Sequence, residues 1–203
     1  MKKFGKVLGI IVALIVLAAV GIFGYSKYED YQREKEKKEK EEEKIAALSK
    51  INYTIPEGFG LPSPGDRGYG YIDYNYEEND MLAQIVLEVW NQEKYPAYES
   101  VEERITSIMD GAEERGEAII QGPEDVDLNG LKGQMVVIGS QNVSEEWDVH
   151  LLSQSNYYVF EKDGYLYIFK YNIIDERMGD RDDAQTNKCV TSREVFVNSI
   201  GAK

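Results

Sequence analysis

An uncharged stretch near the N-terminus places the strongest constraint on how this chain folds. Residues 7–25, VLGIIVALIVLAAVGIFGY, contain no charged residue and no proline over 19 positions. As a helix that rises about 1.5 Å per residue, the stretch is about 28 Å long, close to the hydrocarbon thickness of about 30 Å. A helix satisfies its own backbone hydrogen bonds, so it can cross a bilayer alone. We therefore predict a transmembrane helix over residues 7–25, preceded by a basic N-terminal tail at residues 1–6.

Two other interpretations of this stretch are a buried core helix and the apolar region of a cleaved signal peptide. A signal peptide usually has an apolar region of about 7–15 residues that ends at a small-x-small site. Residues 19–21 fit such a site, but Ile22 and Phe23 continue the apolar run beyond it. We therefore favour an uncleaved, single-pass signal anchor.

Two observations about the orientation of this anchor disagree. Lysines and arginines are more numerous after the apolar run than before it, which by the positive-inside rule favours a cytoplasmic domain. Long C-terminal domains, however, translocate largely regardless of charge, and a short basic tail is a poor segment to export. We expect a domain on the extracytoplasmic side of the cell membrane.

A low-complexity charged tract, SKYEDYQREKEKKEKEEEKIAALSK, occupies residues 26–50. Glu34–Lys38 and Glu36–Lys40 have the i,i+4 spacing at which opposite charges stabilise a helix by about 0.2–0.5 kcal/mol per pair. No apolar heptad runs through the tract, which argues against a coiled coil. The tract is either a helical stalk that holds the domain off the bilayer or a partly frayed linker, and both interpretations make it a spacer.

The net charge of -14 comes from the globular part of the chain. From residue 50 onward there are 13 bases and 29 acids, against 10 bases and 8 acids before it. This acidity argues against binding nucleic acid, whose phosphates are held by Lys and Arg. The single cysteine excludes an internal disulfide framework and a four-cysteine zinc site, and the single histidine excludes a multi-histidine metal site.

Residues 51–203 are predicted to form an α+β domain, in which one antiparallel β-sheet is flanked by two helices. The expected order is β-β-β-α-β-β-β-β-α. In YYVFEKDGYLYIFKY, Asp163-Gly164 between alternating aromatic runs is a strong hairpin signal. Strands are also expected at residues 52–55, 69–74, 81–90, 118–120, 134–139 and 147–154, with a turn region over 123–130 and a polar loop over 175–188.

Capping boxes predict where the two helices begin. Ser100 with Glu103 starts the first and Thr191 with Glu194 starts the second. The residues expected to face the core from these helices and from the strand at 81–90 are Val101, Ile105, Ile108, Met109, Ala112, Phe196, Ile200, Ile85, Leu87 and Val89.

Several of these segments together resemble the PsbP-like fold family. They are YTIPEGF, DLNGLKG, the aromatic hairpin and the terminal REVFVNSI, and the likeness covers most of residues 51–203. In that family a first strand ends at a Pro-Gly-aromatic turn, which matches Pro56, Gly58 and Phe59. The resemblance implies a non-enzymatic binding or assembly subunit of the kind found among small bacterial envelope proteins. No lipobox cysteine precedes the domain, so a membrane helix would replace a lipid anchor, and no catalytic residues or photosynthetic role carry over.

No motif in the domain has the spacing of a known catalytic, cofactor or metal site, so we predict no catalytic, cofactor-binding or metal-binding residue. Gly65, Gly68 and Gly70 open a strand, whereas phosphate-binding glycines open a helix. Two acidic groups offer oxygen ligands for Ca²⁺ but lack the EF-hand pattern, and acidic surface loops explain them better. The first group is Asp180, Asp182 and Asp183, with Asp175 and Glu176 nearby in the sequence. The second group is Glu124, Asp125 and Asp127.

Three further features are weaker signals. His150 and Cys189 are a conceivable base and nucleophile, but nothing in the sequence brings them together. Residues 52–54 and 142–144 match the glycosylation sequon, which matters only in a eukaryotic secretory pathway. The 15 tyrosines suit either a half-buried sheet or a stacking surface, and the first interpretation is favoured. They cluster at Tyr69, Tyr71, Tyr74 and Tyr76, and at Tyr157, Tyr158, Tyr165, Tyr167 and Tyr171.

The sequence thus favours a membrane-anchored extracytoplasmic binding or assembly module without catalytic activity. Its expected partners are the membrane, through residues 7–25, and an envelope protein or ligand of unknown identity, but not nucleic acid. The alternative is a cell-envelope hydrolase that uses paired carboxylates, which would have to lie about 5–10 Å apart.

Overall fold

The computed structural model describes residues 27–60, 63–64, 72–78, 81–94, 100–144, 149–175 and 183–203. Contacts between residues divide the chain into two compact units, Met1–Glu43 and Lys44–Lys203. Within the described ranges, no helix is both long and apolar enough to cross a membrane. The predicted transmembrane helix at residues 7–25 lies outside the described residues.

A helix over residues 27–48 contains most of the charged tract. Exposed ion pairs join Lys35 to Glu39, with 3.7 Å between Nζ and Oε1, and Lys38 to Glu42, with 3.9 Å between the same atoms. The tract is therefore helical over this range. The second compact unit starts inside the helix, at Lys44, whereas we expected the domain to begin at residue 51.

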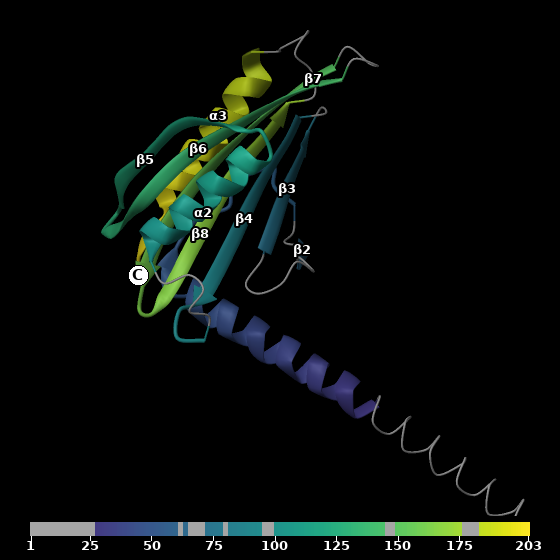
Figure 1. The fold of residues 1–203 in the computed structure, drawn as a ribbon, viewed down its shortest axis with the longest axis vertical. Helices are drawn as coiled ribbons and strands as arrows, with labels where there is room; N and C mark the ends of the chain where they lie inside the picture. Colours follow the sequence, from purple (N-terminus) through teal and green to yellow (C-terminus); the bar gives the residue numbers. More distant parts are fainter. Residues whose placement is uncertain are drawn as a thin grey trace, which may run out of the picture. The chain divides into compact units, whose positions relative to one another are not determined.

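Antiparallel strands form the main sheet of the second unit, and they lie side by side in Figure 1. Seven strands are described, and the five that are 11–14 residues long carry most of the core. Among the described strands of this sheet, β4 and β8 are the one pair of partners that do not follow each other along the chain, so their pairing joins the two halves of the sheet. In spatial order the strands are β2 (Ser63–Pro64), β3 (Ile72–Glu78), β4 (Met81–Asn91), β8 (Tyr165–Asp175), β7 (Val149–Lys162), β6 (Leu131–Ser144) and β5 (Ala118–Leu128).

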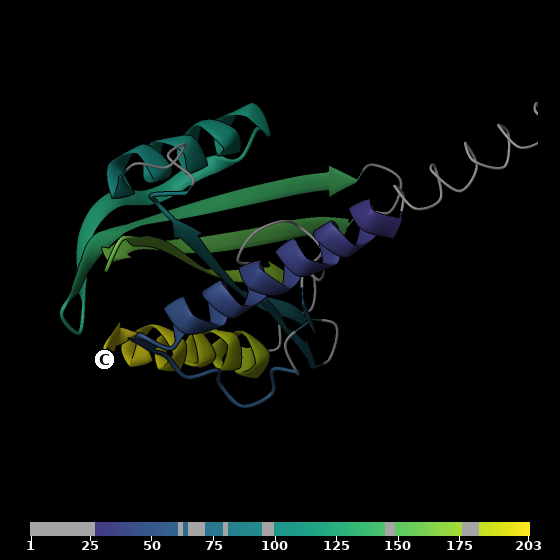
Figure 2. The same cartoon turned by 90° about the horizontal axis from the view of Figure 1, so that it is seen from below.

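One helix covers each face of this sheet, so the prediction of an α+β fold with two flanking helices is confirmed. Figure 2 shows α2 (Val101–Glu114) and α3 (Asp183–Ser199) on opposite sides of the strands. The α2 side of the core holds Ile105, Ile108, Ala112, Val136, Ile138, Val159, Leu166 and Ile168. The α3 side holds a larger cluster that includes Ile85, Leu87, Val89, Phe160, Tyr167, Phe169, Tyr171, Phe196 and Ile200.

The start of α2 is held by three side chains. Ser100 caps the helix, because its Oγ accepts a hydrogen bond from the Glu103 amide at 3.1 Å, as the capping box predicts. Glu161 of β7 accepts a second bond, at 3.1 Å, from the Val101 amide. A half-buried ion pair, 3.5 Å long, then joins Arg104 to Glu88 of β4. These contacts fix α2 to two strands at once.

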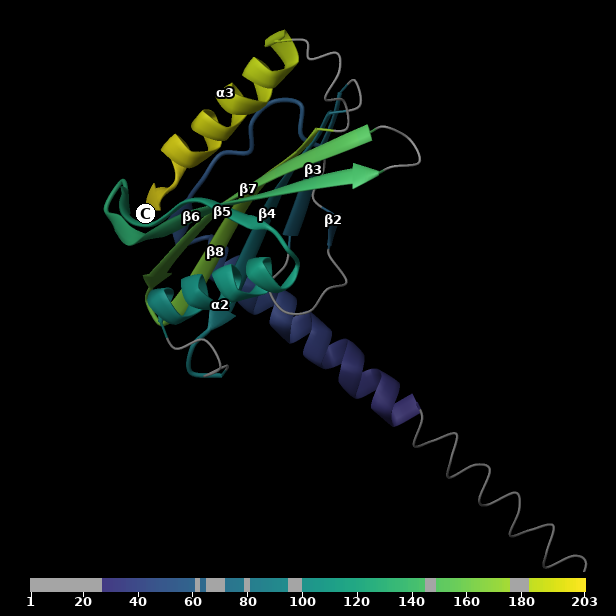
Figure 3. The ribbon, with the colours of Figure 1, turned by 45° about the horizontal axis from the view of Figure 1, so that its top comes forward.

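A second, two-stranded sheet connects the beginning and the end of the second unit. β1 (Ile51–Asn52) pairs antiparallel with β9 (Gly201–Ala202). Beside β9, Asn129 Nδ2 donates hydrogen bonds to the main-chain oxygens of Asn198 and Ile200, at 3.0 and 2.7 Å. The end of the chain therefore lies against the β5–β6 turn, as Figure 3 shows.

The predicted aromatic hairpin is confirmed. Asp163 and Gly164 have φ values of 52° and 77°, and Lys162 pairs with Tyr165 on either side of them. Two positive φ values are typical of the type I′ turn that matches the twist of the two strands.

The expected turn over residues 123–130 is wrong except at its end. β5 continues to Leu128, and only Asn129-Gly130 turn the chain, with φ values of 50° and 90°. β5 is the last strand of the sheet, and on such an edge a residue without an amide donor, such as Pro123, is tolerated.

The expected start of the second helix is also wrong. α3 begins at Asp183, so residues 183–188 of the expected loop are helical, and Thr191 lies in the helix interior. The pattern Thr-x-x-Glu, which predicts a capping box, also fits a helix interior. The helix instead begins at Asp183, whose negative charge complements the positive N-terminal end of the helix dipole. In addition, β7 (Val149–Lys162) contains both the described part of the strand expected at 147–154 and the first strand of the aromatic hairpin. The strand expected at 52–55 is only Ile51–Asn52.

Candidate functional site

An open groove lies beside the last turn of the 27–48 helix, within the second unit. We call it the junction groove, and its volume is about 530 Å³. The segments that line it come from the helix end, from β1 with the two residues after it, and from the end of the chain. Its lining residues are Ile45, Leu48, Ser49, Ile51, Asn52, Tyr53, Thr54, Ser199 and Lys203.

Hydrogen bonds fix the polar side chains of the junction groove. Asn52 Nδ2 donates to the main-chain oxygen of Ala202 at 3.1 Å. Ser199 Oγ accepts from the Thr54 amide at 2.7 Å and donates to the main-chain oxygen of Phe196 at 2.6 Å. The bonds from Asn52 to Ala202 and from Thr54 to Ser199 join segments about 150 residues apart in the sequence. The groove therefore exists only when β1 and β9 are paired.

The helix end beside the groove is anchored to the main sheet. The buried Tyr167 hydroxyl donates to the main-chain oxygen of Ala47 at 3.0 Å. Lys162 Nζ donates to the main-chain oxygens of Lys50 and Lys203, at 3.1 and 3.5 Å. Burial, and then the nearby Asp163 carboxylate, raise the pKa of Tyr167 to about 12, so its hydroxyl keeps its proton over the physiological range. One wall of the groove is therefore hydrogen-bonded to strands of the main sheet.

The chemistry of the lining residues suits binding. Part of the polar lining bonds within the protein: Ser49 Oγ donates to the main-chain oxygen of Ala46 at 2.7 Å, and Asn52 and Ser199 also bond to main-chain groups. Thr54 adds a hydroxyl and Lys203 a cation, beside aliphatic and aromatic surface. Such groups hold a ligand by hydrogen bonds and packing. Sequence reasoning marked only residues 52–54, as a sequon, and missed the groove because no local pattern signals a site assembled from both ends of the domain.

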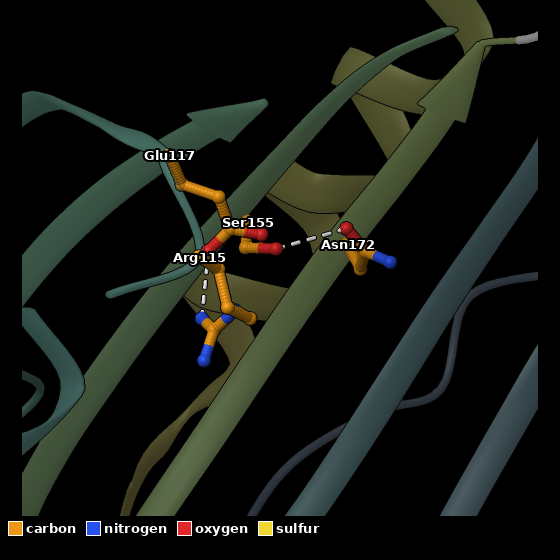
Figure 4. A network of polar contacts seen from close by, with 4 residues as sticks. All are labelled: Arg115, Glu117, Ser155 and Asn172. Carbon is orange, nitrogen blue, oxygen red and sulfur yellow. Dashed lines mark hydrogen bonds and ion pairs between the residues drawn. The ribbon is translucent and has the colours of Figure 1, made fainter. Parts of the chain in front are cut away.

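A second polar cluster lies near the C-terminal end of α2, and Figure 4 shows it at close range. Arg115 and Glu117 form an ion pair of 2.6 Å, and the hydrogen bond to Glu117 raises the pKa of Arg115. Across β7 and β8, Ser155 Oγ donates to Asn172 Oδ1 at 2.9 Å. Each of these groups thus has its partner within the cluster, which indicates a structural role.

The α3 side of the sheet carries a third polar feature, around the buried Asn156. Its Oδ1 accepts from Gln154 and from Arg193 of α3, both at 3.5 Å, and its Nδ2 donates to the main-chain oxygen of Tyr171 at 3.4 Å. Burial raises the pKa of the neighbouring Tyr158. A buried amide that bonds to a helix side chain fixes the position of that helix on the sheet.

The acidic group at Glu124, Asp125 and Asp127 does not converge. Glu124 accepts from Gln121 and Asp125 from Gln134, both at 3.1 Å, while Asp127 accepts from the Gly130 amide at 2.7 Å. Within the described part of the chain, no group of three or more His, Cys, Asp or Glu side chains is placed to hold a metal ion.

Other sequence candidates fall where the structure gives no side-chain description. His150 is part of β7 and Cys189 of α3, but neither side chain is described, nor are those of Asp175 and Asp183. The remaining candidates outside the described residues are Gly65, Gly68, Gly70, Tyr69, Tyr71, Glu176, Asp180 and Asp182. The side chains of Tyr74 and Tyr76 and of the second sequon, residues 142–144, are likewise not described.

The hairpin tyrosines are mainly core residues. Tyr158, Tyr167 and Tyr171 are buried, as the half-buried-sheet interpretation expects. Tyr157 is partly exposed, and Lys170 Nζ lies over its ring, 5.2 Å from the ring centroid.

Comparisons with known proteins add no relative: no family model and no curated protein matches the chain.

Proposed function

We propose that this protein is a membrane-anchored extracytoplasmic binding or assembly module of the PsbP-like type, without catalytic activity. The single observation that carries the proposal is the junction groove, whose lining of hydroxyl, amide, aliphatic and aromatic groups suits non-covalent recognition. The uncharged run at residues 7–25 supports the anchor.

Two features of the described residues support the PsbP-like assignment. The chain turns at residues 57–58, after Pro56, and Gly58 has a φ of 95°. Phe59 then packs edge-on against Tyr171, with ring centroids 6.0 Å apart. A Pro-Gly-aromatic turn is one of the features on which the resemblance rests, although β1 ends at Asn52, four residues before Pro56.

The experiment is site-specific photo-crosslinking in intact cells that produce the full-length protein. A photoreactive residue replaces Thr54 in the groove or, as the control, the exposed Glu124 on β5. We expect a crosslinked partner or ligand from position 54 and none of the same mass from position 124. Equal products at both positions, or turnover of a substrate by the anchored protein with no groove-specific partner, would overturn the proposal.

Topology is tested separately, by protease treatment of intact cells with a C-terminal tag. An extracytoplasmic domain is digested before lysis. Protection of the tag until the cells are lysed would place the domain in the cytoplasm and remove the premise of an envelope partner.

A further inference from the structure

Two tyrosines at the beginning of the described helix are unusually exposed. Tyr28 and Tyr31 expose 60% and 63% of their surface, more than the other large hydrophobic residues of the described chain. They are three residues apart on a helix that turns about 100° per residue, so they lie about 60° apart around its axis. The two rings therefore share one side of the helix.

The position of the pair along the chain points to a lipid surface. The predicted transmembrane run ends at residue 25. If the helix continues back to that residue, its rise of about 1.5 Å per residue places Tyr28 about 4.5 Å and Tyr31 about 9 Å beyond the hydrocarbon edge. The headgroup layer on each side is about 5–7 Å thick. Because helical side chains lean toward the N-terminus, both rings reach back into this layer.

The charges around the pair indicate which force would hold it there. Lys27 and Arg33 are balanced by Glu29 and Asp30, so residues 27–33 carry no net charge. Attraction of this segment to anionic lipid is therefore weak. Tyrosine, in contrast, has an apolar ring and a polar hydroxyl, and it is enriched at membrane–water interfaces whatever the lipid charge.

We propose that Tyr28 and Tyr31 form an interfacial anchor that docks into the headgroup region of the bilayer and sets the depth at which the 27–48 helix leaves the membrane. The inference rests on the proposed membrane anchoring. The occupant of this surface is the lipid interface, and a second copy of the chain is the competing outcome.

The test uses the full-length chain in phosphatidylcholine vesicles that contain lipid brominated near the headgroup end of its acyl chains. A tryptophan replaces Tyr28, Tyr31 or, as the control on the same helix, Glu41, which is about 24 Å beyond residue 25 at the same rise. The native tryptophans are replaced by phenylalanine. The same three variants are also made in a chain that keeps its native tryptophans. In that chain, the quenching of the unsubstituted protein is subtracted, and the difference reports the new tryptophan alone.

We expect brominated lipid to quench Tyr28→Trp strongly, Tyr31→Trp less strongly and Glu41→Trp not at all. The same quenching is expected when a quarter of the lipid is replaced by anionic phosphatidylglycerol. No quenching at positions 28 and 31 in a protein that remains in the vesicles would overturn the interfacial anchor and leave the membrane anchoring intact. Protection from a water-soluble quencher without quenching by lipid would instead indicate a second copy, and quenching only with anionic lipid would indicate electrostatic attachment. A chain that does not enter the vesicles would overturn both this inference and the proposed anchoring.

Discussion

The last turn of the charged helix is a part of the globular core, and replacing Leu48 by Ala tests this directly. Leu48 exposes 4% of its surface and packs in the α3-side cluster, although it belongs to a tract that looks like a solvated spacer in the sequence. Ile45, three residues earlier on the same helix, exposes 57% and provides a matched control. We expect Leu48→Ala to destabilise the second unit and Ile45→Ala to leave it almost unchanged.

The expected cost follows from the burial of Leu48. The substitution removes the equivalent of about three methylene groups at about 0.8 kcal/mol each, or about 2.4 kcal/mol of transfer free energy. A residual cavity would add about 24 cal/mol per Å³. Because Leu48 also lines the open junction groove, its surroundings can relax and the cavity stays small. We therefore expect Leu48→Ala to lower the free energy of unfolding by about 2–3 kcal/mol, against less than about 0.5 kcal/mol for Ile45→Ala.

The assay is urea unfolding monitored by circular dichroism. It uses the 44–203 fragment, which corresponds to the second compact unit. With an m-value of about 1–3 kcal/mol/M, the expected loss of about 2–3 kcal/mol lowers the unfolding midpoint by about 0.7–3 M at unchanged m. The unfolding midpoint of a 51–203 fragment is compared with that of 44–203 in the same assay. The shorter fragment should be less stable, because it lacks Leu48 and also Ala47, whose main-chain oxygen accepts the Tyr167 hydrogen bond.

Equal midpoints for Leu48→Ala and Ile45→Ala would refute this reasoning. A 51–203 fragment as stable as 44–203 would refute it independently, because the core would then not need the helix end.

Three other perturbations test different parts of the fold. Gly133→Ala should lower the free energy of unfolding by about 1–3 kcal/mol, because the new Cβ would overlap the main-chain oxygen of Val159. Gly111→Ala, inside α2, should instead stabilise by about 0.5–1 kcal/mol, and a urea midpoint for Gly133→Ala equal to or above that of Gly111→Ala would contradict the packing. For Tyr167, a folded pKa of about 12 against an ordinary 10.0 means that its contribution to stability is complete below pH 10 and is lost as the pH rises through 12. Tyr167→Phe should therefore flatten the loss of stability measured between pH 10 and 12, and an unchanged slope would speak against a buried hydroxyl. In limited trypsin digestion of the full chain, cleavage at Arg33 and Lys35 should precede cleavage at Lys50, since the main-chain oxygen of Lys50 is bonded to Lys162; the reverse order would be inconsistent with an anchored helix end.

Local patterns were sufficient wherever neighbouring residues decide the conformation. Asp163-Gly164 forms the predicted turn because both residues adopt positive φ, and the strands on either side pair directly next to them, from Lys162 and Tyr165 onward. Ser100 caps α2 because the amide that it accepts from, that of Glu103, is only three residues away. The burial of Phe196 and Ile200 could be predicted too, since they are four residues apart in an apolar pattern of helical spacing, although α3 ends at Ser199.

Local patterns failed at two places. Residues 183–188 are polar in the sequence, yet they are the first turns of α3. The sequence of β5 looks like a turn because of Pro123 and its acidic residues. It forms a strand because it pairs with β6 at the edge of the sheet, where a proline is tolerated.

The amino-acid sequence alone determined the class of the fold and the hairpin at the centre of the sheet, because periodicity, capping and turn residues act over a few positions. For the charged tract it left a helical stalk and a frayed linker open, and the structure decided for a helix over residues 27–48. The sequence also led us to expect a membrane anchor at residues 7–25. Only the tertiary structure decided that Ala47 and Leu48 belong to the core and that Asn52 and Thr54 meet Ala202 and Ser199 in one groove. Those contacts join residues that are far apart in the chain, so no local pattern signals them, and closing the long loop between them costs conformational entropy that the rest of the fold must offset.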